Sequence, residues 1–123
     1  MRSMPVELRP LEALTLWHRV TLDLVREDGQ DLSHDLSARQ LAILLTIYLE
    51  PPPHTVRGLA GKLGVTKPVI TRALDTMGRL DLVARRRDDA DRRNVVIQRT
   101  VKGALAVERL GDLIVAQGRV LPR

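Results

Sequence analysis

The segment 55–80 constrains the fold more than any other part of the chain, because it encodes two short amphipathic helices joined by a tight turn. Thr55 is placed to cap the first helix, and Gly64 is placed to end it in the left-handed conformation that glycine tolerates. The apolar residues of that helix recur at i, i+3, i+4 and i+7: Val56, Leu59, Ala60 and Leu63. Thr66 is placed to cap the second helix, and Pro68 lies in its first turn, where a missing N–H costs little.

The second helix of this pair, 66–80, divides into an apolar stripe and a polar ridge. The stripe consists of Val69, Ile70, Ala73, Leu74, Met77 and Leu80. The polar side chains left outside are Lys67, Thr71, Arg72, Asp75 and Arg79. In a helix-turn-helix unit the first helix supports the second, whose N-terminal residues reach base edges in the major groove of DNA. Arginine can pair with guanine through two hydrogen bonds, and threonine offers a hydroxyl or a methyl group. The pair indicates a DNA reader; a plain helical hairpin with a polar outer face is the alternative.

A ten-residue stretch follows, "RRRDDADRRN" at 85–94, with five arginines and three aspartates. Taken alone it is typical of a solvated charge run. The segments "LVA" before it and "VVIQ" after it are rich in β-branched residues, which predicts a β-hairpin with a polar tip. A hairpin directly after a recognition helix is a wing, whose basic stem at 85–87 can lie along phosphates while its tip enters a minor groove. Asp91 is expected to pair with Arg72 or Arg92 and so to order the tip.

Three further helices are predicted around this unit. Apolar residues at helical spacing indicate a helix at 11–27 and another at 101–119. Between them, Ser37 with Gln40 three residues later forms a capping-box pattern at the start of a strongly apolar helix, which the prolines at 51–53 end. The expected buried face of this central helix is Leu41, Leu44, Leu45 and Tyr48. The elements together predict a mostly α fold with a small β-hairpin wing (α+β), in a single domain of residues 1–123.

Composition excludes several other classes of protein. The chain has no phenylalanine, one tryptophan and one tyrosine, so its core must be aliphatic. Without cysteine it can form neither a disulfide nor a cysteine-ligated zinc site. No apolar run approaches the roughly 20 residues that span a bilayer, and prolines and acids interrupt the N-terminal segment where a signal peptide must be apolar. We therefore expect a cytoplasmic protein with no membrane partner.

The sequence contains no motif that indicates an enzyme. The histidines at 18, 34 and 54 are isolated and have no metal-ligand spacing. The "DDAD" segment lacks the pattern of a calcium loop, and the chain suggests neither a phosphate-binding loop nor a nucleophilic triad. We expect no catalytic residues, no metal and no cofactor.

The charge is distributed unevenly along the chain. Residues 1–50 carry five arginines and eight acids, a net charge of −3, whereas residues 51–123 carry fifteen basic residues and seven acids, a net charge of +8. Such an asymmetry fits a polyanion-binding half joined to a part with another role, and it is also compatible with a merely basic soluble protein.

The segment "LAGKLGVTKPVITRALDTMGRLDLVARRRDDADRRNVVIQRTVKG" at 59–103 resembles the winged helix-turn-helix core of the MarR (multiple antibiotic resistance regulator) family. The wing of that family carries an Asp-x-Arg motif, here Asp91-Arg92-Arg93. The resemblance covers 37–103 well and the flanking helices loosely. It implies a homodimeric transcription regulator, often a repressor, that binds pseudo-palindromic double-stranded DNA.

In this interpretation the recognition helix 66–80 lies in the major groove and the wing 85–98 in the minor groove. The resemblance implies Arg93 as the minor-groove arginine and Asp91 as its structural companion. The expected DNA-binding residues are Thr66, Lys67, Pro68, Thr71, Arg72, Arg85, Arg86, Arg87, Arg92 and Arg93. The alternative function is a winged-helix module that binds another protein, or that binds DNA architecturally without sequence specificity.

Three departures from the family pattern bear on these expectations. Asp81 stands where the family usually has glycine, but aspartate tolerates the left-handed conformation, so the turn is expected to persist. Arg99 stands where leucine is usual. The sequence ends at Arg123, before the last helix of the family, so dimerisation is expected to rest on the helices 11–27 and 101–119.

The apolar faces available for that dimer are formed by Leu11, Leu14 and Trp17 with Leu105, Leu113 and Ile114. The alternative is that these side chains simply pack within one protomer. The resemblance also implies a small-molecule effector between the dimerisation helices and the winged core, near Trp17, His18 or Tyr48. Ordinary core packing is the alternative for these three residues, since no polar constellation around them selects a ligand.

Overall fold

The computed structural model describes residues 7–26 and 36–121, and within these ranges the chain forms helices and strands close to the predicted positions. The elements are α1 (Pro10–Arg26), α2 (Ala38–Leu49), β1 (His54–Thr55), α3 (Val56–Leu63), α4 (Lys67–Arg79), β2 (Val83–Arg87), β3 (Val95–Arg99) and α5 (Val101–Arg119). The predicted mostly α fold with a β-hairpin wing is confirmed. The N-terminal residues 1–6, the last residue of the predicted helix 11–27 and the histidine at position 34 lie outside the described residues.

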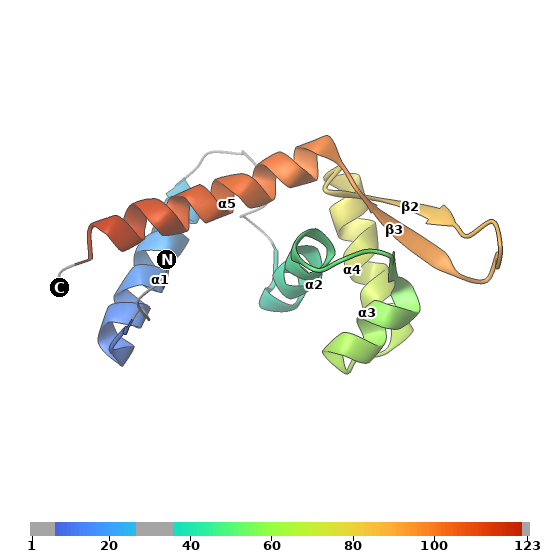
Figure 1. Cartoon of the computed structure of the whole chain (residues 1–123), viewed down its shortest axis with the longest axis horizontal. Helices are drawn as coiled ribbons and strands as arrows, with labels where there is room; N and C mark the ends of the chain where they lie inside the picture. Colours follow the sequence, from blue (N-terminus) through green and yellow to red (C-terminus); the bar gives the residue numbers. More distant parts are fainter. Residues whose placement is uncertain (1–6, 27–35, 122–123) are drawn as a thin grey trace, which may run out of the picture.

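The long helix α5 organises the molecule. Figure 1 shows α1 packed along the C-terminal half of α5, with α2, α3 and α4 grouped near its N-terminal end and the β2–β3 hairpin projecting beyond them. The amide Nε2 of Gln117 donates a hydrogen bond to Oδ2 of Asp23 at 2.7 Å, which ties α5 to α1. The hairpin therefore extends from one end of the molecule, next to the helix-turn-helix pair.

The core is aliphatic, as the composition requires. Its largest fully buried side chains are Val20, Ile43, Leu44, Ile47, Leu59, Ile70, Leu74, Met77 and Leu82. The predicted buried face of α2 is incomplete: Leu44 is fully buried and Leu41, Leu45 and Tyr48 pack partly buried against the core, but Ile43 and Ile47, which were not predicted, are fully buried as well. Nearly every residue of α2 is apolar, so its periodicity could not determine which face points inward.

Local capping interactions hold the helix ends. The capping box of α2 is present: the Gln40 N–H donates to Ser37 Oγ at 3.1 Å, and the Ser37 N–H donates to Gln40 Oε1 at 2.8 Å. Thr55 caps α3 by accepting a hydrogen bond from the Gly58 N–H at 2.9 Å. Gly64 ends α3 in the left-handed region at φ 67°. Thr66 occupies the N-cap position of α4, but its side chain makes no capping hydrogen bond.

The wing belongs to a three-stranded antiparallel sheet of order β1-β3-β2. β2 and β3 form the predicted hairpin, in which Val83 lies opposite Arg99 and Arg87 opposite Val95. The short strand β1 pairs with the other edge of β3, with His54 opposite Ile97. This third strand was not predicted, because two residues between a proline run and a helix carry no readable periodicity.

The turn after α4 sets the direction of the wing. Asp81 has φ 58°, so it adopts the left-handed conformation. This conformation is the one expected at a position where the family usually has glycine. The Leu82 N–H donates to the Met77 carbonyl at 2.9 Å and closes the end of the helix. The expectation that aspartate preserves this turn is confirmed.

Candidate DNA interface

The helix α4 presents a polar ridge on a rigid base. Its apolar stripe is anchored in the core through Ile70, Ala73, Leu74 and Met77. Lys67, Pro68, Thr71 and Arg72 are all exposed and lie along one side, since residues three and four apart share a helix face. Thr66 is exposed at the start of the ridge. The five residues that the sequence predicts on the recognition helix therefore form one contiguous outer surface.

The stem of the wing is joined to the recognition helix by an ion pair. Nη2 of Arg85 in β2 lies 2.8 Å from Oδ1 of Asp75 in α4. Arg85 alternates in phase with the buried Val83 along the strand, so its side chain is directed to the face that α4 covers. Arg85 thus differs from Arg86, Arg87 and Arg92, which form no ion pair within the described residues, because its charge is paired with a carboxylate of the recognition helix.

Aspartates of the wing hold its tip in shape through hydrogen bonds within the tip itself. Asp88 accepts a hydrogen bond from the Ala90 N–H at 3.0 Å, and Asp91 accepts one from the Arg93 N–H at 3.1 Å. Both are bonds from a carboxylate to a backbone amide two residues later, the arrangement that aspartate commonly forms in turns. A guanidinium N–H of Arg87 also donates to the Arg92 carbonyl at 2.7 Å across the tip. The acidic residues therefore have a structural use in an otherwise basic wing.

The partner of Asp91 differs from the one expected from charge alone. Oδ1 of Asp91 lies 3.6 Å from Nε of Arg93, and within the described part of the chain Asp91 pairs with neither Arg72 nor Arg92. The turn that brings Asp91 to the Arg93 amide also places the Arg93 side chain beside the carboxylate. The Arg93 side chain is 94% exposed and extends from the tip. Arg86 and Arg92 are exposed as well.

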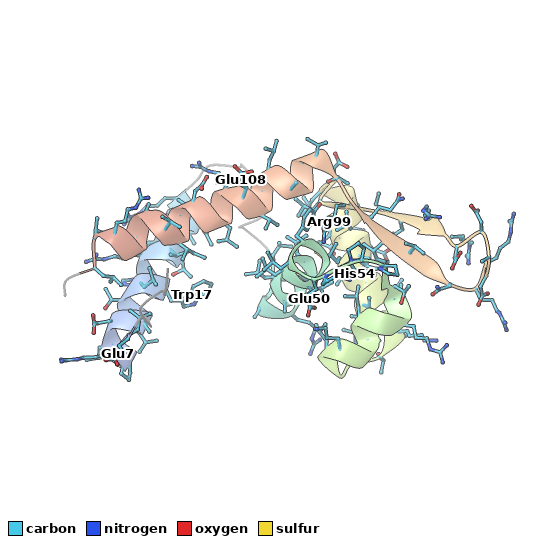
Figure 2. The ribbon with its side chains drawn as sticks, in the orientation of Figure 1. Glu7, Trp17, Glu50, His54, Arg99 and Glu108 are labelled. Carbon is cyan, nitrogen blue, oxygen red and sulfur yellow. The ribbon has the colours of Figure 1, made fainter. Side chains whose placement is uncertain are left out.

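Arg99 supports the base of the wing. It lies at the end of β3, where its Nε donates to the Ile47 carbonyl at 2.8 Å and its Nη2 donates to the Glu50 carbonyl at 2.9 Å. Figure 2 shows Arg99, Glu50 and His54 in the region where β3 lies beside the end of α2. The carbonyls at a helix C-terminus lack intrahelical partners, so Arg99 satisfies two acceptors that α2 leaves free. The departure from leucine thus introduces a bond between the wing and the central helix.

Tyr48 joins the same elements from the other side. Its hydroxyl donates to the Leu82 carbonyl at 2.6 Å and accepts from the Thr100 N–H at 2.9 Å. Thr100 in turn donates through Oγ1 to the Asp81 carbonyl at 2.7 Å and caps α5 by accepting from the Gly103 N–H. The turn after α4, the end of β3 and the start of α5 therefore meet at one side chain. This role of Tyr48 could not be predicted from the sequence, because the two ends of these bonds are far apart in the chain.

Other kinds of site are not apparent in the part of the chain that is described. Among residues 7–26 and 36–121, no three His, Asp or Glu side chains are grouped so that they could hold a metal ion. No helix in the same ranges is both long enough and apolar enough to cross a membrane. The exposed ridge of α4 and the arginine-bearing wing remain the surface with the clearest chemical character.

Comparison with known proteins agrees with this geometry. The MarR family model matches residues 36–95, from the start of α2 to the start of β3. No curated protein matches the chain in sequence. Among solved structures, a mutant of Staphylococcus aureus MepR bound to an oligodeoxyribonucleotide superposes with a TM-score of 0.75 at 20% identity, covering 90% of this chain and 76% of that one.

Two further structures share the fold over most of their length. The PcaV transcriptional regulator from Streptomyces coelicolor, in complex with its natural ligand, has a TM-score of 0.62 at 22% identity and covers 98% of this chain and 82% of that one. MarR itself has a TM-score of 0.63 at 26% identity, covering 92% of this chain and 81% of that one. The winged core of the chain, residues 36–95, is therefore a MarR-family domain, and the chain shares its fold with these regulators.

Proposed function

We propose that this protein is a sequence-specific, double-stranded DNA-binding transcription regulator that acts as a homodimeric repressor. The observation that carries the proposal is the rigid connection between two exposed basic surfaces: the ridge of α4 and the wing, joined by the Arg85–Asp75 ion pair. The ridge suits a major groove, where Thr71 and Arg72 can read base edges. The tip of the wing suits the adjacent minor groove, with Arg93 inserted. The DNA-bound state of the MepR structure supports this assignment by similarity of fold.

The homodimer is proposed from the apolar surface of α1 and α5. Leu11, Leu14 and Leu105 are 77%, 62% and 61% exposed in the protomer, and Trp17 is half exposed. The sequence left open whether these side chains pack within one protomer instead of forming a dimer. In the protomer they remain largely exposed to water. A second copy that covers them removes apolar surface from water, and it produces the two-fold symmetry that a pseudo-palindromic site requires.

A small-molecule effector is part of the same proposal. The PcaV structure holds its natural ligand, and the two chains share their fold. Figure 2 shows Trp17 extending from α1 on its side toward α2. Trp17 is the only tryptophan of the chain, so its fluorescence reports on this region without interference. Metabolites that change Trp17 emission are expected to lower DNA affinity in the same concentration range; a change in emission with unaltered DNA affinity would contradict an effector role.

The function is tested by separating base recognition from phosphate attraction. The full chain is titrated onto a duplex enriched from a random pool and onto a scrambled duplex, over a series of salt concentrations. Arg72→Ala is expected to reduce the preference for the enriched duplex by roughly 5- to 150-fold, corresponding to about 1–3 kcal/mol. Arg93→Ala is expected to weaken binding and to reduce the salt dependence, because it removes a cation from the DNA surface.

The matched control is Arg119→Ala, which removes an exposed arginine at the far end of α5. It is expected to bind both duplexes like the parent. Circular dichroism melting checks that each variant remains folded. If Arg72→Ala and Arg93→Ala both bind like the parent, the proposed interface is wrong.

A further inference from the structure

The recognition helix has a second cationic neighbour besides the wing. A surface groove of about 300 Å³ runs between the start of α2 and the outer side of α4. Ser37, Arg39 and Gln40 line it from α2, and Val69, Arg72 and Thr76 line it from α4. Two arginines thus border the groove, and no acidic side chain does. Arg39 was not among the residues expected at the DNA interface.

The groove on the opposite side of α4 has a different electrostatic character. It lies between α4 and β2 and is bordered by Asp75, Arg79, Asp81 and Arg85, so its formal charges cancel. Two of these four, Asp75 and Arg85, are also paired directly with each other. Arg39, by contrast, is exposed and has no ion pair or side-chain hydrogen bond within the described residues. Of the two grooves, the one on the α2 side of the recognition helix is therefore the one with a net positive charge.

The geometry of a DNA duplex in contact with α4 places a sugar-phosphate strand beside Arg39. A helix in the major groove, which is about 12 Å wide, has one sugar-phosphate strand on each side of it. If the ridge of α4 occupies that groove, the wing faces the strand on the β2 side. The other strand then faces the groove between α2 and α4. An exposed arginine at that position contacts phosphate without reading bases, and such contacts set affinity and register more than sequence preference.

We propose that Arg39 and the groove between α2 and α4 form a phosphate-binding surface that holds the second DNA strand beside the recognition helix. The proposal rests on the DNA-binding function proposed above and adds a contact from α2, outside the helix-turn-helix pair and the wing. Arg39 supplies the charge and α2 supplies the rigidity, because the capping box at Ser37 and Gln40 fixes the first turn on which Arg39 stands. The surface recognises the DNA backbone, so its contribution is the same for every sequence.

The size of the effect follows from counterion release. Each phosphate neutralised by the protein contributes about 0.9 to the slope of log affinity against log salt concentration. At 0.15 M salt, loss of one such contact weakens binding about 5-fold, and loss of both contacts of a symmetric dimer weakens it about 30-fold. Arg39→Ala is expected to produce these changes equally on the enriched and the scrambled duplex. Arg39→Lys keeps a cation and is expected to keep most of the parent slope.

The measurement is fluorescence anisotropy of labelled duplexes with the full chain, repeated at several salt concentrations, with Arg119→Ala as the control. Alanine is the best helix former, so Arg39→Ala is expected to melt like the parent. If Arg39→Ala retains the parent affinity and slope, the phosphate-binding surface is refuted while the DNA-binding function stands. A loss of affinity with an unchanged slope, or one confined to the enriched duplex, also refutes it. If the parent itself binds no duplex in a salt-dependent way, the proposed function fails.

Discussion

Gly103 lies where α5 packs against the central helix and the turn after α4, and its substitution tests that packing directly. A Cβ atom built at Gly103 lies 1.9 Å from the Tyr48 hydroxyl oxygen and 2.2 Å from the Leu82 carbonyl oxygen. Carbon and oxygen in ordinary contact are separated by about 3.4 Å or more. Gly103→Ala must therefore displace both the tyrosine and the backbone of the turn after α4.

The expected loss of stability combines three contributions. Overpacking of this kind typically costs about 1–3 kcal/mol. Displacing the Tyr48 hydroxyl weakens its hydrogen bonds to Leu82 and Thr100, each worth about 1 kcal/mol net. Alanine offsets at most about 1 kcal/mol through its higher helix propensity. We expect Gly103→Ala to lower the free energy of unfolding by about 3 kcal/mol.

The matched control is Gly111→Ala in the same helix. A Cβ at Gly111 has no atom within 4 Å, so only the helix propensity acts and the variant is expected to gain about 0.5–1 kcal/mol. Urea denaturation followed by circular dichroism measures both variants, at one protein concentration because dimerisation contributes to stability. If the two substitutions change stability equally, or if Gly103→Ala is stabilising, then the convergence of α2, the turn and α5 at this point is not as described.

Three further predictions follow from other contacts. Arg99→Leu removes the donor to the Ile47 carbonyl and one of the two partners of the Glu50 carbonyl, whose other partner is His54 Nε2 at 3.0 Å, and it is expected to destabilise the protein by about 1–2 kcal/mol in urea denaturation, whereas an unchanged midpoint would mean that water replaces the guanidinium. Ser37→Ala removes the N-cap acceptor of α2 and is expected to cost about 1 kcal/mol by the same assay; no change would show that the cap is not formed in solution. Leu14→Glu places a charge in the exposed apolar face of α1 and is expected to convert dimers to monomers in sedimentation velocity, and a persistent dimer would locate the interface elsewhere.

Predictions that depended on neighbouring residues were the most accurate. The capping box at Ser37, the helix end at Gly64 and the turn at Asp81 each arise from a few consecutive residues, so their local chemistry was sufficient. The hairpin was readable for the same reason, since two β-branched segments surround a polar tip. The buried face of α2 was predicted only in part, without Ile43 and Ile47, because a segment that is apolar on nearly all sides has no polar face to mark the solvent.

The features that escaped prediction depend on tertiary contacts. The strand β1 exists because β3 offers it an edge, and its two residues contain no signal of their own. Arg99 looked like an unexplained departure, and only the fold brings it to carbonyls about fifty residues away, at the end of α2. Charge types alone suggested Arg72 or Arg92 as the partner of Asp91, whereas the resemblance to the family pointed to Arg93, which the turn geometry places beside it. The DNA-binding roles of the exposed arginines stay predictions.

In the proposed complex, two protomers present their recognition helices and wings to one duplex. This arrangement is tested by selecting bound duplexes from a random pool with the full chain and sequencing them. We expect an enriched inverted repeat whose half-site centres lie about one helical turn apart, roughly 34–36 Å. Retention of duplexes with no enriched sequence, or no retention even at low salt, would contradict it.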